Sequence, residues 1–155
     1  MNKSIDKTLC FTGHRKVIHS GVSDRIKEVI SLFAEDGFEY FISGGALGFD
    51  MLAASCVVEM KKKYNNIKLI IAVPCRNQSS TWSTREKQAY EKMLESADEV
   101  IVLSEEYYRG CMHNRNRYMV DNSTVCICYA YKKTGGTSYT VNYARKKGRT
   151  IVSVI

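Results

Sequence analysis

Two kinds of hydrophobic pattern alternate along the chain. Short, almost continuous apolar runs are typical of buried strands, and they predict strands at residues 8–12, 40–42, 68–73, 99–103, 125–129 and 151–154. Between them, apolar residues recur three and four positions apart, which predicts helices at residues 23–35, 51–62, 83–96, 112–121 and 137–147. Ser23 is expected to cap the first helix and Gly37 to end it.

The strict alternation of strands and helices predicts an α/β fold. Strands that are apolar on both faces are typical of a mostly parallel sheet with helices on both faces. We therefore expect a single Rossmann-like, nucleotide-binding domain over residues 1–155, with no linker or internal repeat. In such sheets ligands bind beyond the carboxyl ends of the strands, near the point where the strand order reverses.

The composition excludes several other classes of protein. A hydrophobic content of 45% and a single proline argue against disorder, and no apolar run is long enough to span a membrane. The first seven residues lack the apolar stretch of a signal peptide. We therefore expect a soluble, cytoplasmic protein with no membrane partner.

The six cysteines predict neither disulfides nor a metal site. Four of them fall in apolar strands or on an apolar helix face and are interpreted as small buried side chains, namely Cys10, Cys56, Cys126 and Cys128. Cys75 and Cys111 fall in loops at strand ends, where they could face a ligand. Because no Cys or His pairs have the spacing of a zinc site, we predict no metal.

Positive charge is concentrated in the last third of the chain. Residues 1–106 hold 14 Lys and Arg against 15 Asp and Glu, whereas residues 107–155 hold nine against one, Asp121. This asymmetry indicates an anionic partner, either nucleic acid or a phosphorylated small molecule. The cluster at residues 145–147, taken alone, is better interpreted as a solvated helix end that complements the helix dipole.

Two glycine-rich turns join a predicted strand to a predicted helix, at residues 43–50 (SGGALGFD) and 134–137 (TGGT). Such turns direct backbone N–H groups toward one point at the positive end of a helix dipole, which suits a phosphate or another anion. Two of them in one small chain predict a nucleotide-like ligand. Neither matches the GxGxxG fingerprint or the Walker A pattern, so NAD-dependent dehydrogenase and P-loop ATPase chemistry are not supported.

The loops beyond the predicted strand ends supply the candidate ligand-binding residues. These are Gly13, His14, Arg15, Ser43, Gly44, Gly45, Gly48, Asp50, Pro74, Cys75, Arg115, Gly135, Gly136 and Thr137. Arg15 and Arg115 suit bidentate contacts with phosphate or carboxylate. Asp50 is expected either to accept hydrogen bonds from ribose hydroxyls or to cap its own helix.

For His14 and for three aromatic residues, the residue type is compatible with both a functional role and a structural role. His14 could act in acid–base chemistry, but a lone loop histidine more often forms structural hydrogen bonds. Trp82 and either Tyr107 or Tyr108 could stack on a base, although aromatic residues more often serve in cores.

The motifs resemble those of the SLOG superfamily, which includes the DNA-processing protein Smf/DprA and the lonely-guy cytokinin-activating enzymes. Within it the chain is most similar to the YpsA-like bacterial and phage proteins. The matching stretches are residues 11–15, 43–50, 72–75, 110–117 and 134–137, which follow one another over nearly the whole chain. The resemblance implies a Rossmann-like fold that binds a nucleotide or a nucleotide-derived ligand.

The lonely-guy enzymes are phosphoribohydrolases with the patterns MHxRKxxM and PGGxGTxxE, and the chain matches only part of them. The matches to the first pattern are Met112, His113, Arg115 and Met119, with Arg115 at the position of the catalytic arginine. Asn116 replaces the lysine, Thr134 replaces the proline, and Asn142 stands in place of the catalytic glutamate. Since glycoside cleavage relies on carboxylates, the hydrolase hypothesis is weakened, and whether the protein is an enzyme stays open.

Three functions are therefore considered. The first is binding, for sensing or sequestering, of a nucleotide-derived phosphorylated ligand; no other cofactor is expected. The second is phosphoribohydrolase-type cleavage with Arg115 as the catalytic residue, and the third is single-stranded DNA binding, which the basic C-terminal third favours. By analogy with the dimeric lonely-guy enzymes, we expect a homo-oligomer, a dimer or larger.

Overall fold

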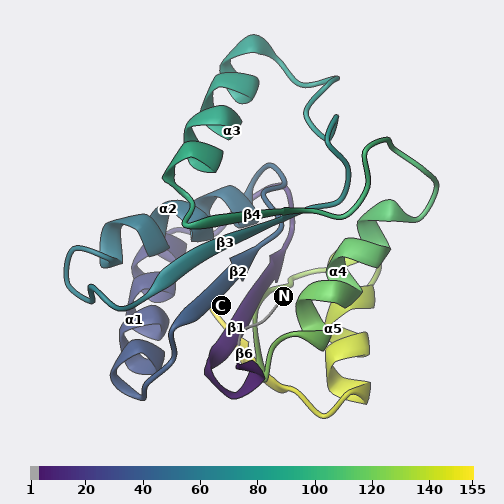
Figure 1. Cartoon of the computed structure of the whole chain (residues 1–155). Coiled ribbons are helices and arrows are strands. Elements are labelled where there is room, and N and C mark those ends of the chain that lie inside the picture. The colour runs from purple at the N-terminus through teal and green to yellow at the C-terminus, as the bar shows by residue number, and fades with distance from the viewer. Residues whose placement is uncertain (1–3) are drawn as a thin grey trace.

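A computed structural model describes residues 4–155 and contains a six-stranded sheet (Figure 1). Every neighbouring pair of strands is parallel, in the order β4-β3-β2-β1-β5-β6. The strands are β1 (Thr8–Gly13), β2 (Tyr40–Ser43), β3 (Lys68–Val73), β4 (Glu99–Val102), β5 (Val125–Tyr129) and β6 (Thr150–Ser153). The predicted α/β, Rossmann-like fold is confirmed. Residues 1–3, which belong to the predicted domain, lie outside the described part.

Helices follow the strands in regular alternation. They are α1 (Val22–Glu35), α2 (Phe49–Met60), α3 (Thr84–Ser96), α4 (Cys111–Asp121) and α5 (Gly136–Lys146), preceded by a short 3-10 helix, η1 (Ile5–Lys7). The prediction that Ser23 caps α1 was wrong, because the helix begins one residue earlier after Gly21 and has no side-chain cap. None of the helices over residues 4–155 is both long and apolar enough to cross a bilayer.

Alternating side chains along the strands enter two separate hydrophobic layers. On β1, Leu9 and Phe11 pack with residues of α1, α2 and α3, whereas Cys10 packs with residues of α4 and α5 on the other face. Figure 1 shows these two groups of helices on opposite sides of the sheet. All six cysteines are unpaired and buried. The interpretation of Cys10, Cys56, Cys126 and Cys128 as core side chains is therefore confirmed.

The strand order reverses at β1. From β1 the chain adds β2, β3 and β4 on one side, and then returns to place β5 and β6 on the other. The loops after β1 and β5 therefore leave the sheet in opposite directions and open a crevice at the carboxyl ends of these two strands. This is the position at which the fold predicts a ligand site.

Candidate functional site

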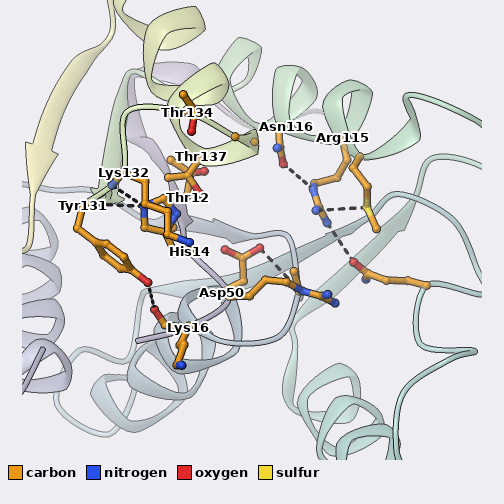
Figure 2. Close-up of a pocket in the computed structure, with 17 residues that line it drawn as sticks. Thr12, His14, Lys16, Asp50, Arg115, Asn116, Tyr131, Lys132, Thr134 and Thr137 are labelled. Carbon is orange, nitrogen blue, oxygen red and sulfur yellow. Dashed lines mark hydrogen bonds between the residues drawn. The ribbon is translucent and has the colours of Figure 1, made fainter. Parts of the chain in front are cut away.

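A pocket of about 550 Å³ lies at the carboxyl ends of β1 and β5 (Figure 2). It is lined from the β1–α1 loop, the start of α2, the N-terminal half of α4 and the β5–α5 turn. The predicted ligand-binding residues in the lining are Gly13, His14, Arg15, Asp50, Arg115, Gly135, Gly136 and Thr137. The structure thus brings together residues that are more than 120 positions apart in the sequence.

His14 ties the two loops of the crevice together. Its Nε2 atom accepts hydrogen bonds from the backbone N–H groups of Tyr131 at 3.0 Å and Lys132 at 3.1 Å, as Figure 2 shows. The Tyr131 hydroxyl donates in return to the carbonyl oxygen of Lys16 at 2.8 Å. Burial and the nearby Lys132 charge lower the pKa of His14, so the ring is neutral at pH 7 and carries its proton on Nδ1. A ring fixed in this way positions loops, as the hydrogen-bonding interpretation predicts.

The turn at residues 43–50 is occupied by contacts within the protein. Ser43 Oγ donates to the carbonyl oxygen of Asp50 at 2.8 Å and accepts from the N–H of Gly45 at 3.3 Å. Asp50 Oδ2 accepts from the N–H of Ala46 at 3.4 Å. Of the residues in this turn, only Ala46 and Asp50 line the pocket. The predicted ligand-binding residues of the turn that lie outside the lining are Ser43, Gly44, Gly45 and Gly48.

At two positions of that turn only glycine fits, because other parts of the protein lie where a Cβ atom would be. A Cβ atom on Gly48 would lie 1.9 Å from the carbonyl oxygen of Arg15, and the φ angle of Gly48 is +88°. A Cβ atom on Gly44 would lie 2.6 Å from Arg115 Nη1. The glycine motif therefore lets the Arg15 loop and the Arg115 side chain pack against the turn.

The Arg115 side chain is buried, connects α4 to the sheet and also lines the pocket. Its Nη1 atom donates to the carbonyl oxygens of Gly44 at 2.5 Å and Ala72 at 3.4 Å, which ties α4 to the ends of β2 and β3. Its Nε atom donates to Asn116 Oδ1 at 2.8 Å. Burial lowers the pKa of the guanidinium, and the Asp50 charge opposes this effect. Since arginine stays charged, Nη2, which also contacts the Met112 sulfur at 3.8 Å, carries positive charge to the pocket wall.

Asp50 contributes the acidic side chain of the pocket lining. Burial raises the pKa of its carboxyl to about 6, and Arg115 and the Ala46 N–H offset this rise only in part. In the view of Figure 2 its carboxylate lies between the side chains of His14 and Arg115. It is not the N-cap of α2, which is Gly48. Of the two predicted roles, helix capping is wrong, and acceptance of ligand hydroxyl groups stays a prediction.

The second glycine turn, in contrast, is open. Ideal Cβ atoms built on Gly135 and Gly136 meet no other atom within 4 Å. Gly136 begins α5, so the unpaired N–H groups of its first turn face the pocket together with Thr137. Arg15, Lys16 and Lys132 belong to the lining of the same pocket. The arrangement combines amide donors, the positive end of a helix and three exposed cations, which suits an anion.

Several predicted residues lie away from the pocket. Pro74 and Cys75 are buried behind it, and Cys75 contacts Cys111. Trp82 packs edge-on against Tyr90, whereas Tyr107 and Tyr108 are exposed on the β4–α4 loop. Asn142 is exposed and accepts a hydrogen bond from Arg145 at 3.2 Å. None of these side chains belongs to the pocket lining.

Sequence reasoning missed several members of the lining, among them Lys16, Asn116, Tyr131 and Lys132. Lys16 follows the selected Gly-His-Arg stretch directly, and Lys132 stands two residues before the second glycine turn. A lysine next to an anion-suited turn at a strand end is the signal that would have found both.

The fold and the position of the pocket place the protein among the Rossmann-like α/β proteins with a site at the reversal of strand order. The chain belongs to the YpsA family: its family model, described as the YspA SLOG family, matches residues 8–152. The SPbeta prophage-derived protein YoqJ of Bacillus subtilis (strain 168) is 36% identical over 138 residues, which cover 81% of each chain. A UPF0398 protein of Bacillus thuringiensis (strain Al Hakam) is 28% identical and covers 92% of this chain and 84% of its own.

Solved structures of DNA processing protein A have the same fold. The Helicobacter pylori protein, described with a single-stranded DNA binding mode, aligns with a TM-score of 0.68 at 17% identity. The Streptococcus pneumoniae protein aligns with a TM-score of 0.69 at 18% identity. The alignments cover 94% and 96% of this chain but 64% and 50% of those proteins. At 17% and 18% sequence identity, the structural similarity establishes a shared fold and nothing more.

Proposed function

We propose that the pocket binds a nucleotide or nucleotide-derived ligand through its phosphates, and that the protein senses or sequesters this ligand in the cytoplasm. The observation that supports the proposal most strongly is the open Gly135-Gly136 turn in a pocket that Arg15, Lys16 and Lys132 also line. Phosphate oxygens accept hydrogen bonds from helix N-terminal amides and from cations of this kind. When the phosphates are bound in this way, the ribose hydroxyl groups donate hydrogen bonds to the Asp50 carboxylate.

Cleavage of the N-glycosidic bond is the less favoured function. A phosphoribohydrolase needs a carboxylate at the glycosidic bond, but Asn142, at the position of the lonely-guy glutamate, lies outside the pocket lining. Asp50 is the carboxylate of the lining, and in the proposed binding mode it holds the ribose hydroxyls instead. Arg115, at the position of the catalytic arginine, is held by Gly44 and Asn116. Steady release of free base from nucleoside monophosphates, followed by chromatography, would instead establish the hydrolase. Loss of that release in Lys132→Ala would place it in this pocket.

Calorimetric titration with pyrophosphate and with ADP tests the binding proposal. Both probes are expected to bind the native protein, and Lys132→Ala is expected to weaken both about tenfold, because a charge-assisted contact contributes about 1.5 kcal/mol or more. Lys146→Ala on the far end of α5 is the matched control and should bind as the native protein does. Absence of pyrophosphate and ADP binding to the native protein would contradict the proposal.

Single-stranded DNA binding remains the third candidate, favoured by the charge of residues 107–155 and by the fold of DNA processing protein A. Its affinity for an oligonucleotide should fall steeply with salt concentration, and a flat response would exclude it.

The expected homo-oligomer is a separate proposal, tested by light scattering of the purified protein.

A further inference from the structure

Two exposed aromatic rings, one on α4 and one on α5, contact each other. The ring centroids of His113, on α4, and Tyr139, on α5, are 4.3 Å apart at an interplanar angle of 57°. Tyr139 is 39% exposed, and its hydroxyl accepts a hydrogen bond from Arg117 Nη1 at 2.9 Å. The tyrosine ring is therefore held from two sides while it stays accessible to solvent.

The two rings are only partly supported by burial in the protein. Aromatic rings contribute to stability mainly by burial, and these two rings remain exposed. A fixed aromatic surface beside an arginine is suited to stacking with a nucleobase, whose face is flat and whose phosphates are negative. The distribution of charge along the chain is consistent with this, since residues 107–155 carry the excess of positive charge.

The ring pair lies on the first turns of the two helices whose N-terminal ends line the pocket. On α4, His113 is three residues before the lining residue Asn116, and on α5, Tyr139 is three residues after the lining residue Gly136, so each ring shares a helix face with a lining residue. Figure 1 shows the two helices next to each other on one face of the sheet. A ligand whose phosphates contact the Gly135-Gly136 turn can thus extend toward the rings.

We propose that His113 and Tyr139 form a stacking platform for the nucleobase of the ligand whose phosphates occupy the pocket. The inference rests on the proposed function and adds a subsite for the base to it. It assigns base stacking to two residues other than Trp82, Tyr107 and Tyr108, none of which lies in the pocket lining. The base belongs either to a free nucleotide or to a single-stranded nucleic acid.

Paired titrations with ADP and pyrophosphate test the platform, because only ADP carries a base. Tyr139→Ala is expected to weaken ADP about tenfold, a typical effect of losing one stacked base, and to leave pyrophosphate unchanged. Tyr139→Phe keeps the ring and should bind ADP within about threefold of the native protein, since only the hydroxyl contact to Arg117 is lost. Tyr107→Ala, which removes an exposed ring away from the pocket, is the control.

The outcomes separate this inference from the proposed function. If Tyr139→Ala weakens both probes equally or neither, the platform is wrong, while pyrophosphate binding to the native protein still supports the phosphate site. If neither probe binds the native protein, the phosphate site itself is wrong. An oligodeoxythymidylate of about ten nucleotides distinguishes the two sources of the base. A selective effect of Tyr139→Ala on the oligonucleotide assigns the platform to nucleic acid.

Discussion

Asp50 keeps a carboxyl group out of water beside a buried arginine, and its ionisation therefore opposes folding. Burial raises its pKa to about 6, above the unfolded value of 3.8. The folded state binds the proton more tightly, so the contribution of this group to stability is full below pH 3.8 and is lost as the pH rises through 6. The shift corresponds to at most about 3 kcal/mol.

Asp50→Asn is accordingly expected to stabilise the protein at pH 8, by up to about 3 kcal/mol, and to have little effect at pH 4. Urea unfolding at the two pH values measures the difference. Glu106→Gln, on an exposed loop, is the control and should show no such gain. A less stable Asp50→Asn variant at pH 8 would mean that attraction to Arg115 outweighs the cost of burial.

Gly48 and Gly136 are both glycines of a strand–helix turn, but the structure gives them opposite roles. Gly48→Ala is expected to cost about 3 kcal/mol or more, because the added Cβ would overlap the Arg15 carbonyl at a positive φ angle. Gly136→Ala meets open space at the start of a helix and should change stability by less than about 1 kcal/mol. Denaturant unfolding of both variants checks the contrast, and similar losses in the two would refute it.

At the scale of elements, the site depends on the connection between the β1–α1 and β5–α5 loops. Neutral His14 accepts two backbone hydrogen bonds across this connection, which a protonated ring cannot do. Its pKa is lowered on folding, so its contribution to stability is present above pH 6.5 and is lost as the pH falls below that value.

His14→Phe is therefore expected to be about 1 kcal/mol less stable than the native protein at pH 8, and nearly as stable as it at pH 5. Thermal unfolding of both proteins at the two pH values gives the comparison. His113→Phe, which replaces a histidine outside these two loops, is the control variant. A constant deficit of His14→Phe at both pH values would show that packing, rather than the acceptor nitrogen, matters.

The elements themselves could largely be predicted from the sequence, because each strand is apolar on both faces and each helix has its own apolar period. The start of α1 could not, since Gly21 at φ +75° precedes it and only the surrounding structure favours that conformation over capping by Ser23. The function of the first glycine turn also escaped prediction. A glycine that leaves room for a bound phosphate cannot be distinguished, from the sequence alone, from one that leaves room for a side chain such as Arg115.

At the scale of the whole molecule, topology decides which strand-end residues meet. Because the strand order reverses between β1 and β5, His14 and Lys132 face one crevice, whereas Cys75, after β3, is buried behind it. The sequence predicted a set of strand ends but not their lateral order. This is why the candidate ligand-binding residues included Pro74 and Cys75, which follow β3 and lie outside the pocket lining.

The same topology places basic residues of the last third of the chain at both ends of α5, with Lys132 in the pocket lining and Arg145 and Lys146 in the last turn of the helix. The excess of eight positive charges in residues 107–155 belongs to a segment that forms α4, β5, α5 and β6. Anionic ligands are attracted to such a face at long range, and salt screens this attraction. We expect a phosphorylated ligand to use the part of this charge that lines the pocket, together with the Gly135-Gly136 turn.

Mass spectrometry of the intact native protein and of the Gly136→Asp variant, both purified gently in the folded state, measures whether such a ligand is bound there. The added carboxylate would occupy the open space of the anion site at a helix N-terminus, where it also favours the helix, so the variant should fold. We predict a phosphorylated nucleoside compound bound to the native protein and lost from Gly136→Asp. A ligand without phosphate, or one retained equally by both proteins, would contradict the account.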